Sequence, residues 1–271
     1  MSIMQSHAYV LRMAADVLDD LEKTRIANQN RMRSLEQDGL GDLKEVAVLA
    51  GIVDGLAKLE HDALLSLQRT VRKHPLGPWV KSNVGLGEKQ AGRLLAALGD
   101  PYWHGLHDRP RTVSELWAFC GYHVLPAGHT TFDSQREVAG RGQAGGDTDQ
   151  CGHNDQRRTV GVAPSRRRGQ RTNWSAEAKM RAYLCAESCI KQRHSPYRKV
   201  YDDAREHYAE AVHGTSCVRC GPKGKPAEIG SPLSDGHKHA RALRKVSKEI
   251  LKDAWRAAKE WHETQETGIA A

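Results

Sequence analysis

The sequence predicts a mainly α protein, in which a long antiparallel helical hairpin precedes a helical domain containing a helix-hairpin-helix. Residues 8–37 and 43–73 each carry an apolar stripe at helical spacing, and the segment QDGLGD separates them. The stretch Val84-Gly-Leu-Gly87 then leads directly into a further helical pattern, which runs to residue 98. Together these patterns favour helices packed on helices.

The hairpin is expected to occupy residues 1–78. The apolar positions of its second helix approach heptad spacing, and HPLGP ends that helix because proline cannot continue it. Each of the two helices leaves apolar surface uncovered. We therefore expect coiled-coil packing against a second copy of the chain, and a homo-oligomer.

The remaining chain divides into three predicted parts. Residues 79–126 form the helix-hairpin-helix region, with a capping box at Thr112-Val-Ser-Glu115. Residues 127–161 are rich in Gly, Asp, Gln and Arg and nearly free of aliphatic residues, so we expect a flexible insertion. Residues 162–263 form a basic helical domain with a Cys/His loop.

Helix boundaries in the last part follow from local signals. Ser175 is a suitable N-cap, and Ser195-Pro196 places serine at an N-cap and proline at the first helical position. The last helix is expected from about residue 240 to residue 262.

The charge of the chain is large and unevenly placed. The 271 residues carry a net charge of +8, with a pI near 9.2. Residues 1–65 hold 7 Lys and Arg against 11 Asp and Glu, whereas residues 157–199 hold 12 against 2. Concentrated positive charge is typical of a surface for a polyanion, and nucleic acid is the default partner.

Targeting signals are not apparent in the sequence. No apolar run approaches the length of a transmembrane helix, and the N-terminal residues lack the basic start and apolar block of a signal peptide. The six cysteines are irregularly spaced, which disfavours a disulfide framework. We expect no membrane partner and a cytoplasmic, nucleoid-associated protein encoded by a bacterium or a phage.

The two glycines of Val84-Gly-Leu-Gly87 suggest that the main chain itself binds a ligand. Without side chains at Gly85 and Gly87, the amides at the start of the next helix can approach a phosphate, and the helix dipole favours the anion. The first turns add Lys89, Gln90 and Arg93. The alternative is an ordinary glycine turn between two packed helices.

Two basic segments supply further candidate DNA contacts. One precedes and enters a helix, and the other recurs at spacings of three and four in the last helix. Their members are Arg166, Arg167, Arg168, Arg171, Lys179 and Arg181, and then Arg241, Arg244, Lys245 and Lys248. A solvated helix face is the alternative interpretation, and two such surfaces in one chain make it less adequate.

A zinc site is predicted from cysteine and histidine spacing. Cys217-Val-Arg-Cys220 has the turn geometry of a zinc knuckle, and His237 and His239 could complete a structural site. Cys151 and His153 are a rival second pair. The alternative is a pair of reduced thiols that bind no metal.

Catalytic motifs are scarce. The sequence contains no Walker loop, no HExxH and no nucleophile elbow. A nucleophilic serine is the remaining candidate, and Ser165 lies beside arginines that could hold a phosphate. The alternative is a loop serine without chemistry.

The order of five sequence blocks resembles the C-terminal domain of Piv-like insertion-sequence transposases, the bridge-RNA-guided recombinases. The resemblance covers about residues 80–260, and the blocks are VGLGEKQAGRLLAALGDPYW, SELWAFCGYHVLPAG, RRRGQRTNWSAEAKMRAYLCAESCIK, SPYRKVYDDAREHY and GHKHARALRKVSKEILKDAW. The predicted hairpin is similar to the coiled-coil segment that those proteins use between subunits.

The resemblance implies a nucleophilic serine after the helix-hairpin-helix, and a guide RNA as a further partner. Ser165 is the position to which the nucleophile carries over, with Ser134 and Ser175 left open because residues 127–161 disturb the alignment. The family begins with a RuvC-like α/β domain that bears acidic metal ligands, and this sequence has no strand pattern to match it. We therefore expect a transposase-like DNA-binding protein rather than a complete transposase.

The expected function is binding of the DNA backbone in transposition or recombination. Two alternatives stay open: a protein that binds RNA or structured nucleic acid, and a non-catalytic oligomeric scaffold built on the hairpin.

Overall fold

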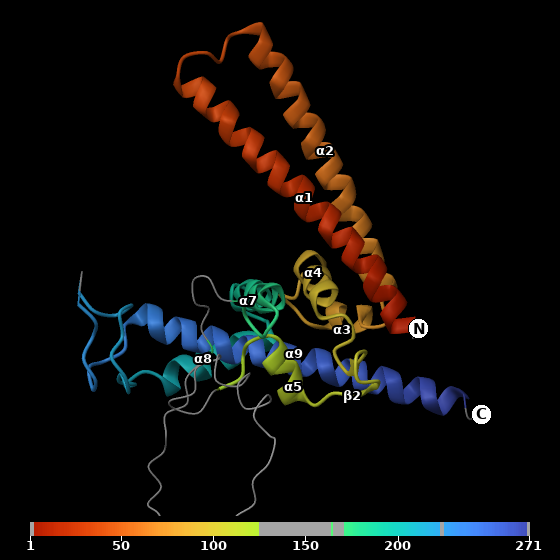
Figure 1. Cartoon of the computed structure of the whole chain (residues 1–271), viewed down its shortest axis with the longest axis vertical. Coiled ribbons are helices and arrows are strands. Elements are labelled where there is room, and N and C mark those ends of the chain that lie inside the picture. The colour runs from red at the N-terminus through yellow and green to blue at the C-terminus, as the bar shows by residue number, and fades with distance from the viewer. Residues whose placement is uncertain (1–2, 125–163, 165–170, 223–224, 270–271) are drawn as a thin grey trace, which may run out of the picture.

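The computed structural model describes residues 3–124, 164, 171–222 and 225–269, and within these residues the fold is mainly α, as predicted (Figure 1). The helices are α1 (Ile3–Gln37), α2 (Lys44–Lys73), α3 (Gly77–Ser82), α4 (Glu88–Leu98), α5 (Val113–Phe119), α7 (Ala176–Ile190), α8 (Pro196–His207) and α9 (Asp235–Ile269). Two short strands, β1 (Trp103–His104) and β2 (Arg109–Pro110), pair in antiparallel fashion. None of the described helices has both the length and the apolarity to span a membrane.

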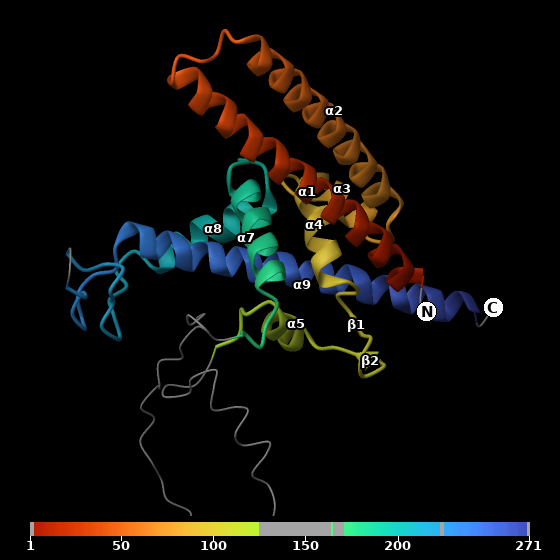
Figure 2. The ribbon, with the colours of Figure 1, turned by 45° about the horizontal axis from the view of Figure 1, so that its top comes forward.

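The first two helices form the expected antiparallel hairpin, which projects away from the rest of the molecule (Figures 1 and 2). Its base is part of the main core rather than a separate domain. Leu11 of α1 and Leu67 of α2 are fully buried in the cluster that includes the side chains of α4, α7 and α9. Helix α2 approaches α4 closely at Gly92, where an added Cβ atom would lie only 2.7 Å from the Val71 Cγ2 atom. The hairpin and the helical domain therefore share one hydrophobic core.

Helix α9 runs along the whole helical domain, and α5, α7 and α8 pack against it (Figure 2). Its apolar face is fully buried, with Leu243, Val246, Ile250 and Leu251 at 0% exposure. Helix α7 contributes small buried residues to the contact, among them Cys185 and Cys189. Burial raises the pKa of the Cys189 thiol to about 11, so this cysteine is an inert core residue, as its helical position predicts.

Carboxylates of α1 hold α4 and α7 through buried ion pairs. Asp19 accepts from both Arg93 of α4 and Arg181 of α7, and Glu22 accepts from Arg93 and Lys89 of α4. Arg93 is 4% exposed and Arg181 is 8% exposed. Two carboxylates of the acidic first part of the chain are therefore neutralised by basic residues of later parts.

Several local predictions are confirmed. Thr112 and Glu115 form a capping box, the Ser175 side chain accepts from the Ala178 amide, and Pro196 opens α8. Helix α9 is longer than expected at both ends. The β-ribbon was not predicted, and the insertion expected at residues 127–161 lies outside the described residues.

The ion pairs yield a first prediction, on stability. The substitution Asp19→Asn removes the charge shared by Arg93 and Arg181 and leaves two nearly buried guanidinium groups under-compensated. We expect the free energy of unfolding, measured by urea denaturation, to fall by about 1–3 kcal/mol. Asp20→Asn is the matched control, because Asp20 is the exposed neighbour and forms no ion pair with the described residues. Equal effects of the two substitutions would contradict the role of the Asp19 pairs.

Candidate functional site

Helix α3, the turn at residues 83–87 and α4 occupy the segment predicted as a helix-hairpin-helix, and the two glycines of the turn have different roles. Gly85 has φ +93°, and a Cβ there would lie 2.9 Å from the Cys189 Cα atom of α7. Gly87 is the N-cap of α4 with φ −63°, and a Cβ there would meet nothing within 4 Å. Gly85 is therefore required by the packing of the turn on α7, and only Gly87 faces open space.

The cations predicted to assist this turn are engaged elsewhere. Lys89 Nζ lies 3.0 Å from Glu22 Oε1, and Arg93 is buried between Asp19 and Glu22. Gln90 is half-buried, and its Oε1 atom has no hydrogen-bond partner among the described residues. The sequence-based assignment of Arg93 and Arg181 to DNA contact is therefore corrected: both guanidinium groups are buried in ion pairs with α1.

Five cations of α7 and α9 lie together on what we call the basic face: Lys179, Arg241, Arg244, Lys245 and Lys248. None of them forms an ion pair with a carboxylate among the described residues, in contrast to the lysines and arginines of α4 and α8. All but Lys179 recur at spacings of three and four on α9, as the sequence predicts. The basic face is thus a local excess of positive charge.

Aromatic rings position these cations. Lys179 Nζ lies 5.9 Å and Arg244 Cζ lies 5.6 Å from the centroid of the Tyr122 ring. Lys248 Nζ lies 3.8 Å from the centroid of the Trp117 ring. Arg241 and Lys245 share the Tyr208 ring in the same way. Contacts of this kind fix the direction of a cation without neutralising it.

Arg244 is the most firmly held member of the basic face. Its Nη2 atom donates to the carbonyl oxygens of Tyr122 at 2.6 Å and of His123 at 2.8 Å. Burial lowers the pKa of Lys179, of Lys248 and of Arg244, and the charge of Arg244 lowers the pKa of both lysines further. These shifts show that the like charges repel one another, and an anion bound here would relieve that repulsion.

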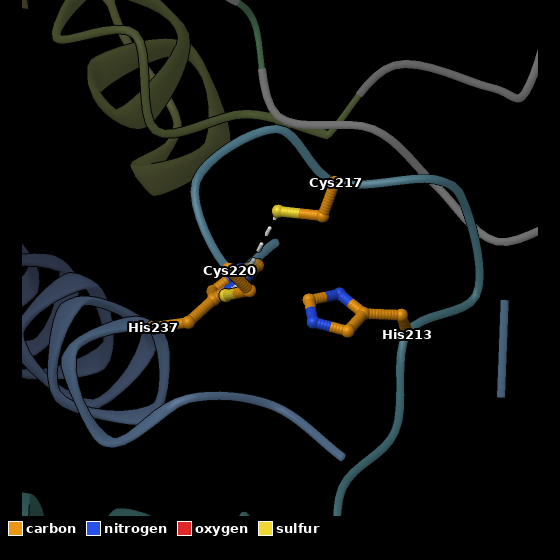
Figure 3. Close-up of side chains that lie close together, drawn as sticks. All are labelled: His213, Cys217, Cys220 and His237. Atoms are coloured by element: carbon orange, nitrogen blue, oxygen red, sulfur yellow. Dashed lines mark hydrogen bonds between the residues drawn. The ribbon is translucent and has the colours of Figure 1, made fainter. Parts of the chain in front are cut away.

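Four side chains that could hold a metal ion gather at the N-terminal end of α9 (Figure 3). His213, Cys217, Cys220 and His237 each offer one ligand atom, and these atoms lie within 4.8 Å of one another. The loop that carries the first three is held by backbone pairing, Val212 with Pro232 and Cys217 with Ala227. Two cysteines and two histidines match the donor set of tetrahedral zinc.

The environment of two of the four side chains favours the form that binds a metal. A hydrogen bond with the Ser234 hydroxyl, followed by the contact with Cys217, lowers the pKa of the Cys220 thiol. Burial, followed by the charge of Arg241, lowers the pKa of His237. A thiolate and a neutral imidazole are both the metal-binding forms.

The cluster corrects the predicted ligand set. His213, which sequence reasoning missed, takes the place assigned to His239, whose Nδ1 atom lies 2.7 Å from the Tyr201 hydroxyl oxygen. The spacing His213-x-x-x-Cys217 is a signal that could have identified it. The rival residues Cys151 and His153 lie outside the described part of the chain.

The remaining predicted residues are placed as follows. Ser165, Ser134 and the arginines at 166, 167 and 168 lie outside the described residues. Arg171 is exposed before α7, and Ser175 caps that helix.

Comparisons with protein-family models, with curated proteins and with solved structures found no match.

The two glycines yield a second prediction. Gly85→Ala places a methyl group against the backbone of α7 at a positive φ, so we expect a loss of about 1–3 kcal/mol in the free energy of unfolding. Gly87→Ala meets no atom at an ordinary φ and should change stability by less than about 1 kcal/mol. Thermal and urea denaturation of the two variants provide the measurement. Similar losses for both would show that the turn does not pack on α7 as described.

Proposed function

We propose that this protein binds the phosphate backbone of DNA through the basic face formed by α7 and α9. The observation that carries the proposal is the grouping of five cations that have no carboxylate partner among the described residues. On α4 and α8, by contrast, every lysine and arginine is paired with a carboxylate. Free cations concentrated on one surface are the electrostatic footprint of a nucleic-acid partner.

The cations of the basic face are also preorganised. Carbonyl oxygens and aromatic rings hold Arg244, Lys179 and Lys248 in place, so binding costs these side chains little further conformational entropy. The repulsion among them favours an occupant with regularly spaced negative charges. A phosphodiester backbone has this property, and contacts of this kind carry no base sequence information.

The helix-hairpin-helix supports the same function in a reduced role. The amides at the start of α4 follow the open Gly87 and could donate hydrogen bonds to a phosphate. The neighbouring Lys89 and Arg93 are neutralised by α1, and Glu88 of the first turn pairs with Arg72. This turn is therefore a secondary contact, and the basic face is the primary one.

The resemblance in block order adds that the binding serves transposition or recombination, at the bacterial or phage nucleoid. In that case Ser165 would be the nucleophile and a guide RNA a further partner. RNA is the second candidate ligand, because its backbone satisfies the same cations. The exposed apolar side chains of the hairpin, among them Met13 and Val48, support association of two copies, which stays a prediction.

A third prediction tests the basic face. The double substitution Arg241→Gln with Lys245→Gln removes two unpaired cations, so we expect weaker binding to duplex DNA and a slope of log K against log salt that is smaller by about 2. Fluorescence anisotropy across a salt series measures both quantities.

The control for this prediction has the same change of net charge. Lys199→Gln with Lys252→Gln removes two cations that pair with Asp203 and Glu249, and it should leave the slope nearly unchanged. Equal losses in the two double variants would mean that net charge, and not the basic face, governs binding. Competition with RNA of equal length decides between the two ligands.

We further propose that His213, Cys217, Cys220 and His237 hold a structural zinc ion. The ion would link the loop before α9 to the first turn of that helix, whose next turns carry Arg241 and Arg244. Two thiolates would balance the charge of the ion, and all four tetrahedral positions would be filled by protein. A closed site of this kind has a structural role.

A fourth prediction concerns this metal. We expect the purified protein to bind one Zn²⁺, and the Co²⁺ form to show the absorption of a tetrahedral site with sulfur ligands. Cys217→Ser and His213→Asn should weaken zinc binding at least about 10-fold and lower the thermal midpoint. His239→Asn is the control and should keep the metal. Loss of zinc in the His239 variant, with retention in the His213 variant, would overturn the ligand set.

A further inference from the structure

A cavity of about 490 Å³ lies between the start of α1, the end of α4 and the β-ribbon, and no step of the proposed backbone binding uses it. Its volume is in the range of sites for small ligands. The aromatic side chains of Tyr9, Trp103 and Phe119 line it, together with aliphatic side chains of α1 and α4. Such walls suit a planar apolar group.

One end of the cavity carries Arg111 together with Asp100, whose carboxylate already accepts from the amides of Tyr102 and Trp103 and contacts His262. The guanidinium carbon of Arg111 lies 5.8 Å from the centroid of the Phe119 ring. Arg111 Nη2 donates to the Trp103 carbonyl oxygen at 2.9 Å, and Arg111 forms no ion pair among the described residues. The Nε atom of Arg111 and the Nδ1 atom of His104 are shielded from water and lack hydrogen-bond partners there. The group expected next to the planar one is therefore an anion.

A second hollow adjoins this end on the side of His123. It has a volume of about 340 Å³ and shares His104, Arg111 and Phe119 with the first cavity. It extends to His123 and Asn173. The carbonyl oxygen of His123 is an acceptor for Arg244 of the basic face. A strand lying on the basic face would therefore reach the cavity past His123 and through this second hollow.

From this arrangement we infer that the cavity takes one unpaired nucleobase of the bound strand, stacked on the aromatic walls, with its phosphate on Arg111. The inference rests on the proposed function and adds to it a preference for DNA that carries an unpaired segment. The chemistry does not read the identity of the base, because every base offers a π-face to an aromatic ring. Broken or single-stranded DNA ends present such bases.

The test distinguishes binding of the bases from binding of the phosphates. One duplex carries a short extension of thymidines, and a second carries the same extension built of abasic sites, so the two have equal charge. The wild-type protein should bind the thymidine form about five-fold or more tightly, as expected for the stacking of one base. Fluorescence anisotropy at fixed salt measures the ratio of the two affinities.

Variants at exposed positions test whether the preference for the thymidine extension arises in the cavity. Phe119→Ala truncates a wall residue that is 38% exposed, and Leu106→Glu puts a carboxylate at a cavity residue that is 92% exposed. Both should reduce the ratio to about one while the affinity for blunt duplex stays unchanged. Val48→Ala, at an exposed position of the hairpin, is the control and should keep the wild-type ratio.

Each outcome bears on one proposal or on both. A ratio near one in the wild type, with salt-dependent binding to blunt duplex, overturns the base site and leaves the basic face. A ratio above one that survives both cavity variants places the base elsewhere and also overturns it. Absence of binding to every form of DNA overturns both proposals.

Discussion

The ion pairs of Asp19 and Glu22 with Arg93 and Arg181 determine how the rest of the molecule is arranged. These guanidinium groups are almost fully buried, and a buried cation without a partner would be strongly destabilising. The base of the hairpin must therefore stay against α4 and α7. The same contacts engage Lys89, Arg93 and Arg181, whereas Lys179 and the cations of α9 at residues 241, 244, 245 and 248 have no carboxylate partner among the described residues.

Periodicity and caps were sufficient to predict the helices, because both are local. The stripes of α1, α2 and α9, the capping box at Thr112 and the proline at the start of α8 each involve residues within a few turns. The pairing of charges was not predictable in the same way. Arg93 and Arg244 are both basic residues on helices, and only the position of α1 makes the first a buried partner and leaves the second free.

The ligands of the metal cluster could likewise be predicted only in part from the sequence. Cys217 and Cys220 are close in sequence, and their spacing alone indicated a site. His237 and His239 were equivalent candidates by sequence, but residues two apart on a helix point in different directions. His237 faces the cysteines, and His239 faces Tyr201 on α8. The fourth ligand comes instead from His213, which backbone pairing of the loop with Ser231 and Gly230 brings to the cluster.

The position of the metal cluster relates it to the basic face. His237 lies in the first turn of α9, and Arg241 and Arg244 follow one and two turns later, so the same helix end carries the ligand and the cations. A cation contributes to phosphate binding only if its position is maintained when the strand binds. The core holds α9 from Leu243 to Ala258, and polar contacts hold its first turn, where Arg205 donates to Asp235 and Lys238 donates to the Ala209 carbonyl oxygen. A closed metal site would add to these contacts a direct link between that turn and the loop, which carries three of the four candidate ligands.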